Sequence, residues 1–178
     1  EIIQSDKNIQ IRDYSSVIAA QVWVEGERKP AISAGFRILA DYIFGNNKPG
    51  QKISMTAPVI QQQGEKIAMT APVIQQAAEG NGQWKVQFIM PSEYTLDTLP
   101  QPNDDRISLL SIPQKRYAVI EFSGFAGQEN LKTHLEELRQ YLSKRNLHPI
   151  GEPLFAFYNP PWTLPFLRRN EIMIELAL

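Results

Sequence analysis

The sequence predicts a single α+β domain in which two amphipathic helices cover one face of a curved, mostly antiparallel sheet or a distorted barrel. Two stretches, 30–44 and 128–145, place apolar residues at helical spacings of three and four, while the segments around them alternate as strands do. The 178 residues are 43% hydrophobic, which suits one core of ordinary size. We therefore treat residues 1–178 as one domain.

The first half of the chain begins with strands. Residues 9–14 and 17–24 alternate and are rich in β-branched side chains, which is typical of strands. A helix is expected at 30–44, because Pro30 suits a first helical turn and the glycine and asparagines at 45–47 end one. Its apolar positions are Ile32, Phe36, Leu39 and Ile43.

A local repeat follows the first predicted helix. Residues 52–62 and 66–76 are almost identical, and a period of fourteen residues is too short for a solenoid unit. The Gln-Gly-Glu stretch at 63–65 favours two extended segments that turn back on each other. Pro58 and Pro72 cannot donate to a sheet, so each copy should end, bulge or lie at an edge there.

The second half repeats the order of the first. Strands are expected at 84–90, 107–112, 117–122, 154–158 and 171–176, with a turn-rich loop at 99–105 and a glycine turn at 124–127. Leu131, Leu135, Leu138 and Leu142 predict the second helix. Gly26 and Gly124 precede the two helices at an offset of 98 residues, which indicates a pseudo-duplicated domain; chance similarity of two helix starts is the alternative.

Composition excludes several classes of function. Without cysteine the chain has no disulfide, thiolate metal site or cysteine nucleophile, and two histidines are too few for a histidine-rich metal site. A net charge of -1 with no basic helix argues against nucleic acid as a partner. No apolar run reaches the roughly 18 residues of a membrane span. The expected protein is soluble, either cytoplasmic or exported after signal removal, because the sequence starts at Glu1 without Met.

Three stretches together resemble the SOUL family of haem-binding proteins. They are the helical segment 36–47, the twin Met-Thr-Ala-Pro-Val copies, and the Tyr158-Asn-Pro-Pro-Trp162 stretch with the Arg168-Arg-Asn-Glu171 stretch. The resemblance runs from about residue 9 to residue 176. It implies a domain similar to the effector-binding domains of bacterial transcription regulators, which holds haem or another tetrapyrrole in a hydrophobic groove near 33–44 and 159–168.

The residues in those regions suit a wide apolar plate with anionic propionates on one edge. Phe36, Ala40 and Phe44 could form one wall, and Trp162, Phe166 and Leu167 the opposite one, with Arg37, Lys48, Arg168 or Arg169 near the carboxylates. The full set of expected binding residues is Ser33, Phe36, Arg37, Ala40, Phe44, Met55, Met69, Tyr158, Trp162, Phe166, Leu167 and Arg168. Each also has a plain structural reading, since helically spaced apolar residues usually form core and the double proline could be only a rigid corner. Likewise, the two methionines could fill the sheet interior, and Arg168 or Arg169 could face solvent at the mouth of a strand or pair with Glu171.

Four functions remain open on these grounds. A non-catalytic tetrapyrrole carrier, buffer or scavenger is the first, and a sensing domain for another planar apolar molecule is the second. The third is a hydrolase that uses Glu93, Tyr94, Glu121 or Tyr158, although the sequence has no nucleophile elbow, zinc-helix motif or phosphate loop. In the fourth, the groove takes a peptide or a partner helix. Neither His134 nor His148 falls in the expected groove, so no axial ligand to iron and no metal site is predicted.

Overall fold

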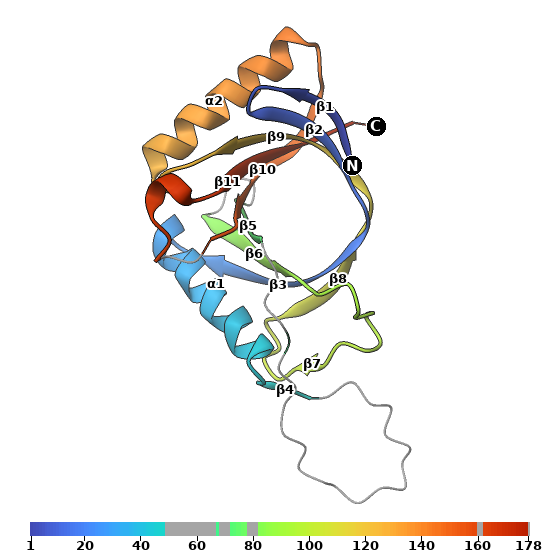
Figure 1. Cartoon of the computed structure of the whole chain (residues 1–178). Coiled ribbons are helices and arrows are strands. Elements are labelled where there is room, and N and C mark those ends of the chain that lie inside the picture. The colour runs from blue at the N-terminus through green and yellow to red at the C-terminus, as the bar shows by residue number, and fades with distance from the viewer. Residues whose placement is uncertain (49–66, 68–71, 78–81, 160–161, 178) are drawn as a thin grey trace, which may run out of the picture.

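The computed structural model describes residues 1–48, 67, 72–77, 82–159 and 162–177. Two long helices and a nine-stranded antiparallel sheet make up most of this part of the chain, and both helices lie on the outer face of the curled sheet (Figure 1). Both helices begin and end within two residues of their predicted limits, at α1 (Arg28–Ile43) and α2 (Gln128–Lys144).

The nine strands of the large sheet run in the order β1-β2-β9-β11-β10-β5-β6-β3-β8. The sheet curls strongly but does not close into a barrel, because β1 and β8 are its two edges. Its strands are β1 (Ile2–Asp6), β2 (Ile9–Tyr14), β3 (Val17–Glu25), β5 (Val73–Ala77), β6 (Gln83–Ile89), β8 (Ser108–Ile112), β9 (Lys115–Phe122), β10 (Pro149–Phe157) and β11 (Asn170–Leu176). A small second sheet pairs β4 (Asn47–Lys48) with β7 (Gln101–Pro102), and one 3-10 turn, η1, spans Pro165–Leu167.

The strand order confirms the pseudo-duplication. In the run β2-β9-β11-β10-β5-β6-β3-β8, the strands correspond in pairs from the two ends inward. The equivalent strands are β2 and β8, β9 and β3, β11 and β6, and finally β10 and β5, which pair with each other at the centre. Gly26 and Gly124 both adopt positive φ, +117° and +99°, and each donates its N–H to a carbonyl of a later loop, at Gly82 and Pro165. Glycine tolerates this backbone conformation without the steric cost of a Cβ.

Each helix covers the outer face of its own half. Leu39, Tyr42 and Ile43 of α1 pack on Val22 and other residues of β3 and β6. In the other half, Leu131, Leu138 and Leu142 pack on even-numbered residues of β9 and β11, which are Ala118, Ile120, Phe122, Ile172 and Ile174. Because successive side chains of a strand point to opposite faces, the odd-numbered residues of these strands line the inner face.

Several local predictions needed correction. Strand β1 was not anticipated, and β10 begins at Pro149 rather than at residue 154, because pairing with β11 extends it past a bulge between Ile150 and Leu154. Phe36 is not fully inside the core: the buried face of α1 is shifted toward Ala31 and Gly35. The turn between the repeat copies lies outside the described residues, and of the second copy 67 and 72–76 are described.

Candidate functional site

The residues predicted on the first helix share one outward face of α1. Ser33, Phe36, Arg37, Ala40 and Phe44 follow one another at helical spacings, and we call them the α1 row. Phe44 is 62% exposed and Phe36 is 37% exposed, while Ala40 between them is half-buried. The row therefore offers two aromatic rings separated by a small side chain on an accessible surface.

Two members of the α1 row, Phe36 and Arg37, are held differently. Phe36 packs edge-to-face on the buried Phe88 of β6, with ring centroids 5.2 Å apart, so its position is fixed by the core below. Arg37 lies along the helix and donates from Nε to the Ser33 carbonyl at 3.3 Å. No ion pair between described residues includes Arg37, which leaves its charge available to an anion at the row.

A second exposed apolar surface follows β10. The late loop, residues 162–168, combines with Phe125 from the turn before α2 to expose five large apolar side chains: Trp162, Leu164, Phe166, Leu167 and Phe125. Trp162 alone is 84% exposed. Monomeric proteins seldom leave such groups together in water unless a ligand or partner covers them.

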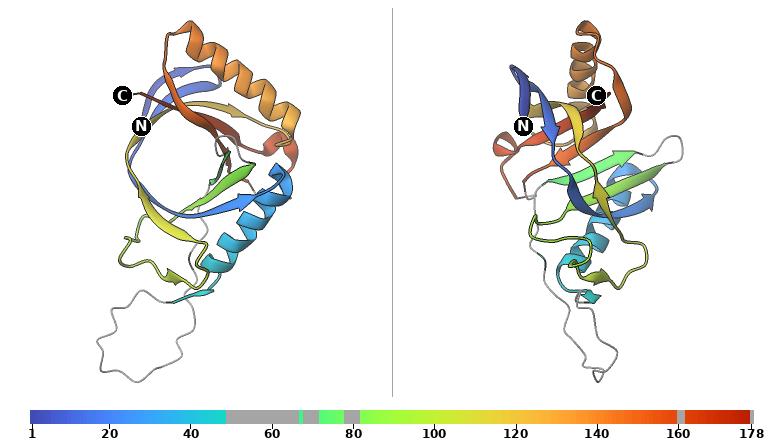
Figure 2. Two further views of the ribbon diagram at one scale, coloured as in Figure 1. Left: turned by 180° about the vertical axis from the view of Figure 1, so that it is seen from behind. Right: turned by 90° about the vertical axis from the view of Figure 1, so that its right-hand side faces the viewer.

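Contacts of the late loop run to the start of α2. Gly124 donates to the Pro165 carbonyl at 2.8 Å, and the Arg168 guanidinium lies 5.3 Å from the centre of the Phe125 ring. In Figures 1 and 2, η1 lies beside the start of α2, whereas the C-terminal end of α1 points away from it. The printed contacts of the late loop thus run to the turn before α2, and the single groove between this loop and the α1 row stays a prediction.

Three predicted site residues remain. Met55 and Met69 fall outside the described residues. Tyr158 sits on the inner face of the sheet, where its hydroxyl donates to Glu171 Oε2 at 2.7 Å. Burial, followed by the neighbouring carboxylate, raises the pKa of Tyr158 well above its usual value. Tyr158 is therefore committed to an internal contact.

Only the Arg169 contact of the ionic cluster around Glu171 was anticipated from the sequence. This carboxylate is fully buried and accepts from Arg12 Nη1 at 2.8 Å, Arg169 Nη2 at 2.7 Å and the Tyr158 hydroxyl. Burial alone would raise the pKa of Glu171, but these hydrogen bonds outweigh it and hold the pKa below its ordinary value. Because Arg12 comes from β2 and Tyr158 from the other side of the late loop, no spacing in the sequence reveals these two donors. The cluster joins strands, and its carboxylate is buried against protein donors rather than open to a ligand.

Neither histidine is placed to bind a ligand at these surfaces. His134 stacks on Phe122 with ring centroids 4.1 Å apart, and its Nδ1 lies 2.8 Å from the Asn130 carbonyl, so it packs α2 on the sheet. His148 lies in the turn before β10 and accepts from the Ala177 N–H through its carbonyl. Among the described residues no group of three possible metal ligands comes together.

The fold defines an α+β domain of two pseudo-equivalent halves that carries exposed apolar surfaces. The chain belongs to the SOUL heme-binding protein family, whose model matches residues 1–64 and 60–175. Heme-binding protein 1 of Xenopus tropicalis is 27% identical over 134 residues, which cover 75% of this chain and 65% of the relative's length. The chain thus spans just under two thirds of that relative.

Two solved structures are similar in fold. A hydrolase from Listeria innocua superimposes with a TM-score of 0.63 at 9% identity, over 98% of this chain and 94% of that one. The C-terminal domain of EcmrR gives a TM-score of 0.61 at 12% identity, over 95% and 96%. At such low identity these matches show the fold and no shared chemistry. Separately, none of the helices among the described residues has both the length and the apolar character needed to cross a bilayer.

Proposed function

We propose that this chain binds haem or a closely related tetrapyrrole without transforming it, as a carrier, buffer or scavenger. Membership of the SOUL family and the 27% identical relative named heme-binding protein 1 support the ligand class. The observation that carries the location is the α1 row, in which Phe36 and Phe44 flank Ala40 on an accessible surface next to an unpaired Arg37.

The row matches what a porphyrin needs. Its two aromatic rings provide flat apolar contact, and the small Ala40 allows the macrocycle to approach the helix. Arg37 is close enough along the same face to meet a propionate, where a guanidinium can bind both carboxylate oxygens. Lys48, in β4 just beyond the helix, is exposed and supplies a second cation near the Phe44 end of the row.

Hydrophobic contact is sufficient for useful affinity. Covering roughly 400 Å² of apolar ligand surface at about 25 cal/mol per Å² contributes on the order of 10 kcal/mol before losses. Association entropy and side-chain ordering remove part of this, which leaves a site of about -8 kcal/mol, or micromolar. Because the His134 ring packs on Phe122 and His148 lies in the turn before β10, neither of them in the α1 row, we infer that iron contributes little and that metal-free protoporphyrin binds comparably.

The late loop supplies a second contact in this proposal. Its exposed Trp162, Phe166 and Leu167 form an apolar surface that a planar ligand or a partner would cover, and Arg168 lies against Phe125 beside them. The loop could complete the site by closing on a ligand seated at the row, or act on its own. Substitutions on each surface distinguish the two arrangements.

A sensing role for another planar apolar molecule is the alternative, and the same surfaces would serve it. Its distinguishing property is a preference for a ligand without propionates, which would leave Arg37 without a function in binding. A hydrolytic role has weaker support, because the likeness to the hydrolase from Listeria innocua is one of fold at 9% identity. Glu121, considered for catalysis from the sequence, lies within 4 Å of Arg12 and Arg169 and belongs to the ionic cluster.

The test is a titration of the full chain with hemin and with protoporphyrin IX, followed by absorbance and by quenching of tryptophan fluorescence. We expect one ligand per chain for both. Phe44→Glu on the row should weaken binding about tenfold, a loss of about 1.4 kcal/mol, whereas Ile150→Glu, a matched change at an exposed apolar residue of β10, should not. Trp162→Ser tests the late loop. Failure of both ligands to bind, or equal affinity of the Phe44 variant, overturns the proposal.

A further inference from the structure

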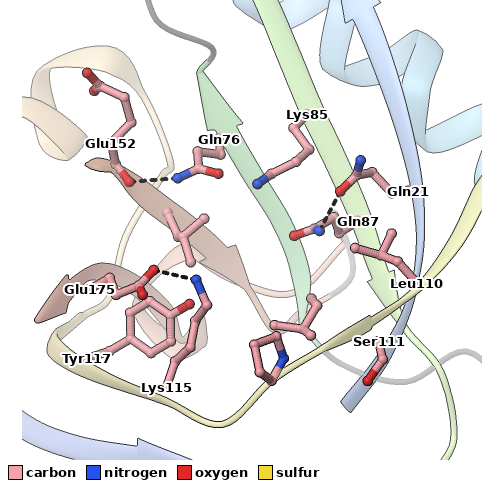
Figure 3. Close-up of a pocket in the computed structure, with 13 residues that line it drawn as sticks. Gln21, Gln76, Lys85, Gln87, Leu110, Ser111, Lys115, Tyr117, Glu152 and Glu175 are labelled. Atoms are coloured by element: carbon pink, nitrogen blue, oxygen red, sulfur yellow. Dashed lines mark hydrogen bonds and ion pairs between the residues drawn. The ribbon is translucent and has the colours of Figure 1, made fainter. Parts of the chain in front are cut away.

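A polar cavity of about 230 Å³ opens on the inner face of the sheet, opposite the two helices (Figure 3). It has room for several waters or a small solute. Side chains from β3, β5, β6, β8, β9, β10 and β11 reach it, so it lies where the two halves of the domain face each other. Neither the α1 row nor the late loop contributes to it.

Lys85 of β6 brings a positive charge into this cavity (Figure 3). The residue is half-buried, its Nζ lies 5.9 Å from the centre of the Trp23 ring, and no ion pair among the described residues includes it. The neighbouring Lys115 is already neutralised by Glu175, with Nζ and Oε2 2.6 Å apart. Burial and then the Lys115 charge lower the pKa of Lys85 by more than the Glu175 carboxylate raises it, which is the response of an ammonium without an ion pair of its own.

The pseudo-symmetry explains why this cation lacks a partner. Val24 of β3 and its counterpart Phe122 of β9 pair across the sheet with Trp84 and Asn170, respectively. The residues that follow these two partners in the sequence, Lys85 and Glu171, therefore occupy equivalent positions in the two halves. Glu171 is satisfied from β2 by Arg12. At the same offset of 98 residues, the equivalents of Arg12 and Tyr14 are Leu110 and Ile112 of β8, which cannot bond to Lys85 and instead line the cavity.

Amide groups surround Lys85. Gln76 donates from Nε2 to the Glu152 backbone carbonyl at 2.8 Å. Because a carbonyl can only accept, this bond fixes which end of the Gln76 amide faces Glu152, and the amide oxygen points to the side of Lys85 (Figure 3). Gln87, which is buried, donates to Gln21 at 2.8 Å. Burial raises the pKa of Tyr117 to about 12, so its hydroxyl stays protonated at neutral pH. In the part of the chain that the structure describes, the cavity thus combines one ammonium outside any ion pair with amide oxygen acceptors, beside the Lys115–Glu175 ion pair and Glu152.

We propose that this cavity binds a small hydroxycarboxylic acid. Its carboxylate pairs with Lys85, its hydroxyl donates to the Gln76 oxygen, and its carbon chain lies against Leu110, Ile112 and Leu154. A carboxylate supplies the missing counter-ion in a partly desolvated place, where a charge-assisted hydrogen bond is stronger than in water. The proposal is independent of tetrapyrrole binding, because the two sites share no residue.

The test is nuclear magnetic resonance of the full chain, titrated separately with lactate, glycerate, propionate and inorganic phosphate. We expect saturable shifts of amide signals along β5 and β6 with lactate and glycerate, and at least about fivefold weaker binding of propionate, a loss of about 1 kcal/mol, because it lacks the hydroxyl. Equal affinity for propionate contradicts the role of Gln76. Binding of phosphate alone, or of none of the four, overturns the proposal.

Lys85→Met removes the charge at similar length and should abolish these shifts, whereas Lys132→Met, at an exposed lysine of α2, should leave them unchanged. Unchanged shifts in Lys85→Met would overturn the proposal. Since Lys85→Met removes an uncompensated charge, its melting temperature should not fall. If the melting temperature of Lys85→Met does fall, Gln76→Leu serves as the second variant. It should bind lactate more weakly than the wild type, and unaltered lactate binding would contradict the proposed role of Gln76. Hemin titration of Lys85→Met should match that of the wild type.

Discussion

Arg12 and Glu171 form a 2.8 Å ion pair between β2 and β11, although 159 residues separate them in the chain. The Arg12 side chain is 12% exposed and that of Glu171 is fully buried. Since β9 lies between their strands in the sheet, the pair spans three neighbouring strands on the inner face. It therefore fixes the N-terminal strands to the second half of the domain.

Glu171→Gln should lower the free energy of unfolding by about 3 kcal/mol. The substitution keeps the size of the side chain but leaves the Arg12 guanidinium buried without its anion. Urea unfolding followed by circular dichroism measures the change. Glu175→Gln is the matched control on the same strand, because Glu175 and its partner Lys115 are both partly exposed, and it should cost less than about 1 kcal/mol. Equal losses in the two variants would contradict a special role for Glu171.

The contribution of Glu171 should depend on pH. Its pKa is lowered in the folded protein, so its stabilisation is complete above the unfolded value of about 4.3 and is lost as the pH falls through the lower folded pKa. The stability difference between wild type and Glu171→Gln should be full at pH 7 and narrower near about pH 3. Urea unfolding of both proteins across this range measures it, and a constant difference would argue against the ionised pair.

Gly35→Ala should destabilise the protein although alanine favours helices. An added Cβ would lie 2.7 Å from Val86 Cγ2 and 3.3 Å from Val22 Cγ1, so α1 would have to move away from the sheet. We expect a loss of about 1–3 kcal/mol from overpacking, net of the roughly 1 kcal/mol gain in helix propensity. Thermal unfolding tests this. In the control Gly127→Ala the new Cβ meets nothing within 4 Å, and little change is expected.

His134→Ala should leave tetrapyrrole affinity within about twofold, which is under 0.5 kcal/mol. The imidazole stacks on Phe122 and lies 2.8 Å from a backbone carbonyl of its own helix, away from the α1 row. The variant should be less stable, since it loses this packing, so the hemin titration is run well below its melting temperature. Loss of the Soret shift in folded His134→Ala would identify His134 as an iron ligand and contradict contact-driven binding.

Local pattern was enough to predict both helices and the duplication. Helical periodicity involves residues within one or two turns, so Leu131 through Leu142 identify α2 without knowledge of its neighbours. The equivalent glycines Gly26 and Gly124 likewise mark the turn before each helix. Family membership also followed from the sequence, because several stretches in a fixed order are specific even where each alone is weak.

Tertiary structure alone decided which distant residues meet. Arg12 pairs with Glu171, whereas Lys85 faces an open cavity and forms no ion pair with another described residue. The reason is that a sheet pairs strands far apart in the chain, such as β2 with β9, and each register brings a new set of side chains together. The α1 row and the late loop were predicted as two walls of one groove, and this groove stays a prediction, because a groove depends on how distant segments pack rather than on local pattern. The sequence determines the chemistry of each side chain, but the packing of the whole domain determines which other side chains it contacts.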